Sequence, residues 1–148
     1  MDYHFTEIGI HQLEEIKALF VQVFTAAPWN DNWSDEKQLE AYLRDLVAQS
    51  NSLTFGLYEG ETMIGLSMGH IRHWYSGTEY YIDELCIRTE TQGKGAGTFF
   101  LKEVEKACRE QGFDHIFLLT DRDVAAYEFY TRRGFYELKK NVALVKKV

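Results

Sequence analysis

The sequence has few of the features that mark secreted, membrane-spanning or low-complexity proteins. Among its 148 residues are two cysteines, Cys86 and Cys108, and a single proline, Pro28. The cysteines form no CxxC pair, which suits a reducing cytoplasm. No apolar run approaches the roughly 20 residues that span a bilayer, and the N-terminus lacks the basic and then apolar pattern of a secretory signal. We therefore expect a cytoplasmic protein that does not use a membrane.

Low-complexity segments and internal repeats are also absent, and the composition is that of a folded domain. Hydrophobic residues make up 45% of the chain and aromatic residues 15%, which argues against disorder. A chain of 148 residues is long enough to bury a substantial core. We expect one domain over residues 1–148.

Positive charge is scarce in the first part of the chain. The net charge of −7 argues against general nucleic-acid binding. Residues 1–90 carry 15 acidic and 5 basic side chains, whereas residues 91–148 carry 8 acidic and 11 basic ones. Two interpretations stay open: an ordinary solvated surface, or a first part that receives a cationic ligand and a second part that holds an anionic one.

The spacing of apolar residues predicts a mixed α/β protein. Apolar residues at helical spacing mark the helices, and short apolar runs between turn residues mark the strands. The expected elements are a strand at 3–10, helices at 13–27 and 34–47 (Ser34 as N-cap), a two-stranded hairpin at 53–74, a strand at 78–90, a helix closed by Gly112, a strand at 115–120, a helix at 123–135 with Asp123 as N-cap, and a strand or hairpin at 135–148. This order predicts a mixed sheet, antiparallel at first and with parallel crossovers later.

Three glycines at alternate positions stand where the third helix is about to begin, in the stretch TQGKGAGTFF. Gly93, Gly95 and Gly97 leave the loop almost free of side chains. Backbone N–H groups of the loop and of the first helical turn then point at one spot, which attracts phosphate, and Lys94 adds positive charge. A tight turn without a ligand is the alternative, although one or two glycines would serve for that.

Two known phosphate-binding motifs do not match this stretch fully. A P-loop requires Ser or Thr after its lysine, and here Gly95 follows Lys94. The dinucleotide fingerprint GxGxxG requires a glycine where Thr98 stands, while Asp121 could imitate the ribose-binding acid. A dinucleotide site therefore stays open as an alternative.

Three segments together resemble the GNAT superfamily of acyl-coenzyme-A-dependent N-acetyltransferases. Residues 92–97 match its Q/R-x-x-G-x-G/A signature, YIDELCIRTE is similar to its central strand, and AAYEFYTRRGF is similar to its A…(F/L)Y…GF segment. The order of elements fits the GNAT fold along nearly the whole chain. The resemblance implies a central mixed sheet flanked by about four helices, acetyl-CoA as co-substrate, no metal, and a homodimer as a common assembly.

The resemblance also implies which residues hold the cofactor. Backbone groups of the central strand, here Leu85, Cys86 and Ile87, would pair with the pantetheine arm like an added strand. The pyrophosphate would meet backbone N–H groups at a helix N-terminus, which the family's motif places at Gln92, Gly93, Lys94, Gly95, Ala96, Gly97 and Thr98. Asp123 stands where many members carry an asparagine that contacts the cofactor, and an ionised carboxylate cannot donate the hydrogen bond that an amide can.

The chemistry requires an acid and a base. Tyr130 falls on the family tyrosine that commonly protonates the leaving thiolate; an aromatic ring packed between helix and sheet is the alternative. An alkylammonium has a pKa near 10.4 and must lose its proton before it attacks. A carboxylate or a water chain can take this proton. Asp83 and Glu84 are the candidate carboxylates, and the position of Asp83 carries the acid in family members that act on polyamines and aminoglycosides. Only one of the two would face the cleft unless a bulge turns both. The alternative is that these acids are solvated at the edge or paired with a cation.

The loop between the first two helices is a candidate for substrate binding. Trp29, Asp31 and Trp33 could cover an ammonium group through cation–π and charge contacts, or the tryptophans could fill the gap between the helices. His70 and His73 are expected on opposite faces of a strand, so we expect no metal site. Cys86 has no His or Asp partner that would make it a nucleophile.

These residues favour direct transfer of an acetyl group from acetyl-CoA to a primary amine. A small cationic amine, polyamine-like or aminoglycoside-like, is the expected substrate, and a protein N-terminus or lysine is the first alternative. Two alternative functions also stay open: a non-catalytic CoA-binding regulatory module and a nucleotide-binding protein.

Overall fold

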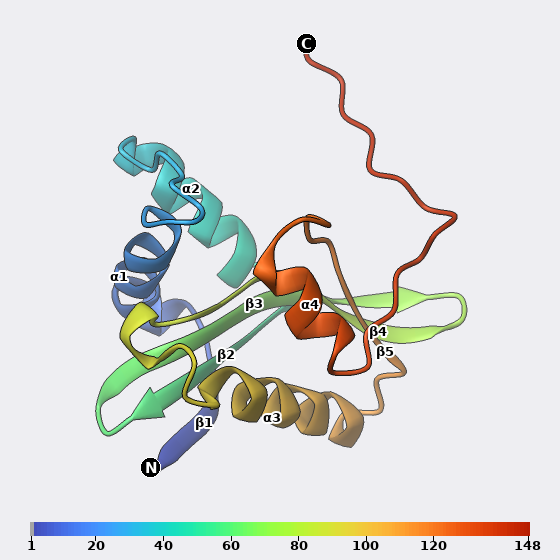
Figure 1. Ribbon diagram of the computed structural model, residues 1–148, viewed down its shortest axis with the longest axis horizontal. Helices are drawn as coiled ribbons and strands as arrows, with labels where there is room; N and C mark the ends of the chain where they lie inside the picture. Colours follow the sequence, from blue (N-terminus) through green and yellow to red (C-terminus); the bar gives the residue numbers. More distant parts are fainter. Residues whose placement is uncertain (1) are drawn as a thin grey trace. The chain divides into compact units, whose positions relative to one another are not determined.

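A computed structural model describes residues 2–148 and confirms a mixed α/β fold (Figure 1). The chain divides into two compact units, one that ends at Leu118 and one that comprises Leu119–Val148. The first unit contains β1 (Tyr3–Ile8), η1 (Ile10–Gln12), α1 (Leu13–Phe24), α2 (Glu36–Val47), β2 (Ser52–Glu59), β3 (Thr62–Trp74), β4 (Gly77–Ile87), η2 (Thr89–Thr91), α3 (Ala96–Glu110) and β5 (His115–Leu118).

The five strands of the first unit form one sheet in the order β1-β2-β3-β4-β5. The first four strands are antiparallel neighbours, and β5 pairs with β4 in parallel after the α3 crossover. The β2–β3 hairpin turns at Gly60, whose φ of +61° is the left-handed conformation that glycine adopts without strain. The sequence therefore predicted both the hairpin and the change from antiparallel to parallel pairing.

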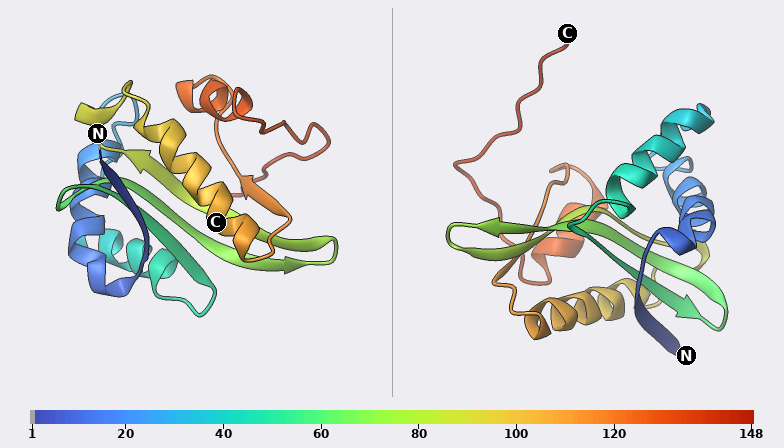
Figure 2. Two further views of the ribbon diagram at one scale, coloured as in Figure 1. Left: turned by 90° about the horizontal axis from the view of Figure 1, so that it is seen from below. Right: turned by 180° about the vertical axis from the view of Figure 1, so that it is seen from behind.

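The two faces of the sheet bury separate hydrophobic cores. Helices α1 and α2 cover one face, which we call the α1–α2 face, and α3 covers the other (Figure 2). The α1–α2 core is built from Leu13, Ile16, Leu19, Phe20, Val23, Phe24, Leu39, Leu43, Val47, Met63, Leu66, Met68 and Cys86. Full burial of such a side chain contributes roughly 1.5–3 kcal/mol, so these faces hold the helices in place.

The helix ends follow local chemistry, with one correction to the sequence prediction. The N-cap of α2 is Asp35 and not Ser34, because the Asp35 carboxylate accepts hydrogen bonds from the N–H groups of Lys37 and Gln38. The first helix stops at Phe24, three residues short of the predicted end at residue 27. At the end of α3, Gly112 has a φ of +81° and closes the helix as predicted.

The second unit contains one short helix, α4 (Ala125–Thr131). Its N-cap is Val124 without a side-chain hydrogen bond, so the predicted capping role of Asp123 is wrong. The predicted strand at 135–148 is also wrong, since no regular element is found there in the described chain. Leu144 and Val145 are 91% and 98% exposed, and alternating apolar residues form a strand only when a partner pairs with their backbone.

Candidate functional site

A β-bulge in β4 brings the two predicted bases onto the same face. In the β3–β4 register, Met68 lies opposite Glu84 and Gly69 lies opposite Ile82, so Asp83 is the extra residue. A bulge interrupts the alternation of side chains along a strand. Glu84 contacts α2, and Asp83 contacts His70, which shares a face of β3 with the buried Met68. Both carboxylates therefore lie on the α1–α2 face.

Gly69 makes this bulge possible. A Cβ atom at Gly69 would lie 2.3 Å from the carbonyl oxygen of Tyr81 and 2.5 Å from the ring of Tyr80. Neither group can withdraw, because the first is backbone and the second is fully buried. Only glycine therefore lets β3 approach β4 closely at this point.

Glu84 forms a hydrogen bond with a tyrosine of α2. The Tyr42 hydroxyl donates to Oε2 of Glu84 over 2.5 Å. Burial raises the pKa of the Glu84 carboxyl above its usual range, the Tyr42 hydrogen bond counteracts this, and the charges of Asp31 and Asp83 raise the pKa further. The pKa of Tyr42 is also raised, chiefly by burial and by its bond to Glu84, so Tyr42 stays a proton donor. The charges of Asp31 and Asp83 thus both act on Glu84.

Asp83 is paired with a histidine of the adjacent strand. Oδ2 of Asp83 lies 2.8 Å from Nδ1 of His70, and the two side chains are 21% and 30% exposed. The His70 ring stacks on the ring of Tyr81 with centroids 4.9 Å apart and an interplanar angle of 21°. The pair is therefore fixed in orientation and still accessible to a ligand.

The edge of β4 beyond the bulge lacks a strand partner among residues 2–118. Pairing with β5 runs from Glu79 to Ile82 and then stops, whereas β4 continues to Ile87. Cys86 packs in the α1–α2 core, and Leu85 and Ile87 pack against the α3 core. The side chains of Cys86 and Ile87 are buried and that of Leu85 is half-buried, so this edge offers mainly backbone groups to a ligand.

The glycine loop connects this edge to α3. Gly93 and Gly95 have φ angles of +79° and +84°, and a Cβ atom at either position would meet no atom within 4 Å. The Gln92 side chain donates to the carbonyl oxygen of Ile87 over 2.9 Å, which ties the loop to the end of β4. Within residues 2–118 the N–H groups of Gly93, Gly95 and Gly97 have no backbone hydrogen-bond acceptor. The loop thus offers donors beside open space at a helix N-terminus, where an anion is stabilised.

Replacing Gly95 by valine should lower CoA affinity at least tenfold, because a β-branched residue is strained at this φ and fills the space above the loop. Calorimetric titration with CoA measures the effect. Gly112→Val is the matched control: its φ of +81° is similar and its surroundings are equally open, but it lies at the other end of α3. The control should lose stability and keep its CoA affinity. Equal CoA binding by folded Gly95→Val protein would show that the loop is only a turn.

The tryptophan loop is packed on one side and open on the other. The Trp33 ring stacks on Tyr42, with centroids 5.3 Å apart, and meets Phe20 edge-on at 5.4 Å, so it fills space between α1 and α2. Trp29 is 36% exposed and contacts Phe24. The Asp31 side chain is exposed, and its charge acts on Tyr42 and Glu84. The loop thereby brings a third carboxylate within electrostatic range of Glu84.

Tyr130 and Asp123 lie in the second unit. The Tyr130 ring is buried at 8% exposure and contacts Phe129 and Phe135, with ring centroids 5.3 and 5.2 Å apart. Asp123 is exposed and precedes α4. Both of these ring contacts are made to residues of the second unit.

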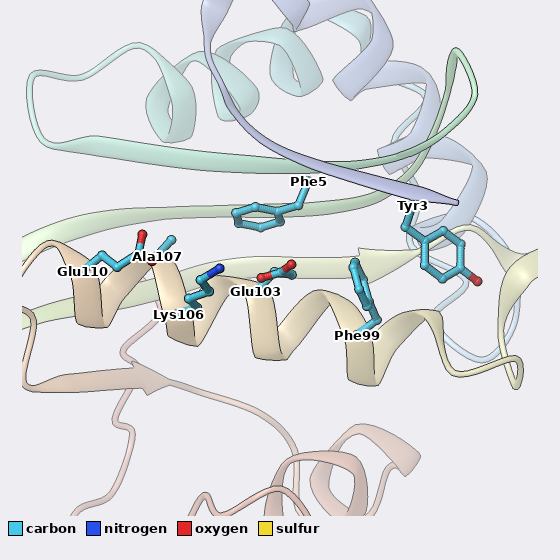
Figure 3. Close-up of a pocket in the computed structure, with 7 residues that line it drawn as sticks. All are labelled: Tyr3, Phe5, Phe99, Glu103, Lys106, Ala107 and Glu110. Carbon is cyan, nitrogen blue, oxygen red and sulfur yellow. The ribbon is translucent and has the colours of Figure 1, made fainter. Parts of the chain in front are cut away.

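A separate depression of about 260 Å³ lies between β1 and α3 (Figure 3). It is lined by Tyr3, Phe5, Phe99, Glu103, Lys106, Ala107 and Glu110, none of which the sequence singled out.

Among the described residues there is no group of three or more His, Cys, Asp or Glu that could hold a metal ion. Within the same part of the chain, no helix has the length and apolar character to cross a membrane.

Sequence reasoning missed two polar partners at the bulge. The sequence places Tyr42 in the helix predicted at 34–47 without a role of its own, and His70 in a strand where no metal site is expected. Each partner lies far along the chain from the acid that it contacts, 42 residues for Tyr42–Glu84 and 13 for His70–Asp83. The one available signal was Gly69, a glycine inside a strand pattern, which is typical of a bulge.

Burial of Glu84 should make stability depend on pH. A carboxyl whose pKa is raised by folding stabilises the folded state while it is neutral, and loses this contribution as pH rises from about 4.5 through the raised pKa. Glu84→Gln stays neutral, so its free energy of unfolding should exceed that of the parent increasingly above pH 4.5, by about 1.4 kcal/mol per unit of pKa shift. Thermal unfolding between pH 4 and pH 8 measures this, with the exposed Glu61→Gln as control. Parallel curves for Glu84→Gln and the parent would contradict it.

The chain is similar to known proteins in both sequence and structure. The chain is 30% identical to the uncharacterized protein YxbD of Bacillus subtilis (strain 168) over 90 residues, which is 56% of this chain and 57% of that protein's length. The structure resembles an aminoglycoside acetyltransferase from an uncultured soil metagenomic sample, solved with sisomicin (TM-score 0.77, 19% identity, 99% of this chain and 96% of that one). It also resembles the aminoglycoside N-acetyltransferase AAC(6')-Iy in complex with CoA (TM-score 0.76, 14% identity, 99% and 96% covered).

At these identities the structural likeness shows the fold. A possible acetyltransferase from Clostridium difficile 630 shares it as well, with a TM-score of 0.82 at 12% identity over 99% of this chain and 98% of that one. The model of the acetyltransferase (GNAT) family matches residues 13–135. The matched segment includes β4 with its bulge, the glycine loop and α4. This chain belongs to the GNAT family of acetyltransferases.

Proposed function

We propose that this protein transfers the acetyl group of acetyl-CoA directly to a primary amine, and that the acceptor is a small cationic amine. The proposal of a cationic acceptor rests on the bulge, because the bulge brings the carboxylates of Asp83 and Glu84 onto one face of the sheet. The Asp31 carboxylate acts on the same face. Membership of the GNAT family supports the transfer of an acetyl group from acetyl-CoA to an amine.

The residues of the first unit fit acetyl-CoA. The N–H groups of the glycine loop would hold the pyrophosphate at the start of α3. The β4 edge from Leu85 to Ile87 would pair with the pantetheine arm through backbone groups, as a strand adds to an open sheet edge. From Ile87 back to Asp83 the strand covers four residues, about 13 Å, so a thioester at the end of the arm would lie beside the bulge.

Direct transfer needs a neutral amine and a stabilised leaving group. The amine nitrogen forms a bond to the thioester carbonyl carbon and the carbon–sulfur bond breaks. The departing sulfur takes up a proton, and the nitrogen loses one as it becomes an amide, which replaces the proton that the donor gave. We propose Tyr130 as the donor of that proton, on the basis of the family's A…(F/L)Y…GF segment at residues 125–135. Burial raises the pKa of the Cys86 thiol, which keeps it protonated and disfavours an acetylated cysteine as an intermediate.

The charge around the bulge favours a cationic acceptor. An ammonium group beside Asp31, Asp83 and Glu84 is attracted by carboxylates that repel one another in its absence. Two of the similar structures are those of aminoglycoside acetyltransferases, one solved with sisomicin. An anionic amine such as glutamate would be repelled by the same face.

A thiol-release screen tests the proposal. Acetyl-CoA is incubated with the protein and with polyamines, aminoglycosides, lysine-containing peptides and glutamate, and free CoA is measured. We expect saturable, amine-dependent release with the first two groups. CoA, and not NAD, should raise the melting temperature. Stabilisation by CoA without release from any amine would identify a non-catalytic CoA-binding module, and stabilisation by NAD alone would identify a nucleotide-binding protein.

A further inference from the structure

The pairing of His70 with Asp83 changes the assignment of the base. Asp83 is one of the two acids that the sequence offers as the base, but its Oδ2 lies 2.8 Å from Nδ1 of His70. A carboxylate can only accept, so in the neutral imidazole Nδ1 carries the hydrogen and donates it to Asp83. This leaves the lone pair on Nε2, the atom that points away from the carboxylate.

Nε2 of His70 is free to meet a ligand. None of residues 2–118 forms a hydrogen bond with this atom, and the side chain keeps 30% exposure. The ring cannot turn easily, because it stacks on Tyr81, which in turn packs on Phe117 of β5 with ring centroids 4.9 Å apart. The direction of the lone pair is therefore fixed by packing as well as by Asp83.

The surroundings of His70 contain carboxylates, tyrosine hydroxyls and one arginine. The carboxylates on this face are Asp83, Glu84 and Asp31, and the hydroxyls are those of Tyr81 of β4 and Tyr42 of α2. The guanidinium of Arg72 lies over the Tyr81 ring at 5.5 Å and is bound by Glu79 at 3.2 Å. Glu79 thus offsets the charge of Arg72, while Asp83 remains available to stabilise an imidazolium.

We propose that His70 is the catalytic base of this protein and that Asp83 is its positioning residue. The inference rests on the acetyl transfer proposed above. The substrate ammonium gives one proton to Nε2 of His70, the imidazolium is stabilised by the Asp83 carboxylate, and the neutral amine attacks the thioester. The proton then leaves Nε2 for solvent through the exposed edge of the ring, which restores the base.

His70→Asn separates the catalytic role from a structural one. The asparagine amide keeps an N–H near the position of Nδ1, so the hydrogen bond to Asp83 survives, but there is no atom in place of Nε2. We expect kcat/KM for an accepted amine to fall by about 10²-fold near pH 7, the low end for loss of a general base. The fall should shrink as pH approaches the amine's own pKa near 10.4, where solvent removes the proton. CoA affinity by calorimetry should stay within twofold of the parent.

Chemical rescue provides a second readout. His70→Ala leaves a gap beside Asp83. Added imidazole should raise the rate of this variant at least fivefold, and it should leave the rate of the parent unchanged. His73→Gln, an exposed histidine of the same strand, is the matched control and should leave activity within twofold. Full activity of His70→Asn with an unchanged pH profile would overturn the inference, and so would loss of CoA binding without rescue. Absence of acetyl transfer by the parent itself would instead contradict the proposed function.

Discussion

Tyr130→Phe is expected to lower kcat by about 10²-fold with little change in the KM for acetyl-CoA. The substitution removes only the hydroxyl, so the ring contacts with Phe129 and Phe135 stay in place. The loss then reflects the proton that the departing sulfur no longer receives. Steady-state rates of thiol release measure it.

A second tyrosine of α4 supplies the matched control. The Tyr127 hydroxyl donates to Glu137 over 2.9 Å, so Tyr127→Phe also removes one hydroxyl and one hydrogen bond from this helix. We expect kcat to be unchanged in Tyr127→Phe. If Tyr130→Phe matches Tyr127→Phe in rate, Tyr130 serves packing and another group protonates the thiolate.

Asp83→Asn is expected to reduce kcat/KM for a polyamine by more than tenfold, which corresponds to over 1.4 kcal/mol of transition-state stabilisation. The amide is nearly isosteric with the carboxylate, so altered shape does not explain a loss. The variant loses a charge that attracts the ammonium, and it loses the anion that stabilises protonated His70. Thiol-release kinetics give the change, and CoA affinity should stay constant.

Salt provides a control for the charge of Asp83. Raising the ionic strength should weaken amine binding to the parent more than to Asp83→Asn, because screening acts only on charge that is present. Glu84→Gln should be milder, since Glu84 is held by Tyr42 and not by His70. If neither substitution changes amine turnover, the cationic acceptor is wrong and the acidic first part of the chain is ordinary surface.

The order of elements up to Leu118 could be predicted from the sequence because apolar periodicity and glycine turns agree there. Gly60, Gly95 and Gly112 all adopt the positive φ angles that their turns require. The cap of α2 was misplaced by one residue, since Ser34 and Asp35 are both capping types and only the local backbone decides between them. The strand predicted at 135–148 has the right alternation, but alternation alone does not supply a pairing partner.

The contacts of the site could not be predicted in the same way. The sequence indicated an acidic pair, and the alternation of side chains along a strand meant that a bulge would be needed to turn both acids to one face. It could not show that Asp83 is the extra residue, because that depends on the register with β3. It could not show the partners Tyr42 and His70 either, since both contacts arise from tertiary packing. Local pattern therefore predicted the residue types, and packing assigned their partners.

The most direct measurement compares two acceptors of equal length that differ by one charge. A linear diamine has two equivalent primary amines and the amino alcohol of the same chain length has one, which accounts for a twofold difference at most. Only the diamine carries a second ammonium for Asp31, Asp83 and Glu84. Release of CoA from acetyl-CoA should show a kcat/KM at least tenfold higher for the diamine, and the preference should fall in Asp83→Asn. Equal kcat/KM values for the two acceptors in the parent would contradict acetyl transfer to a cationic amine at this face.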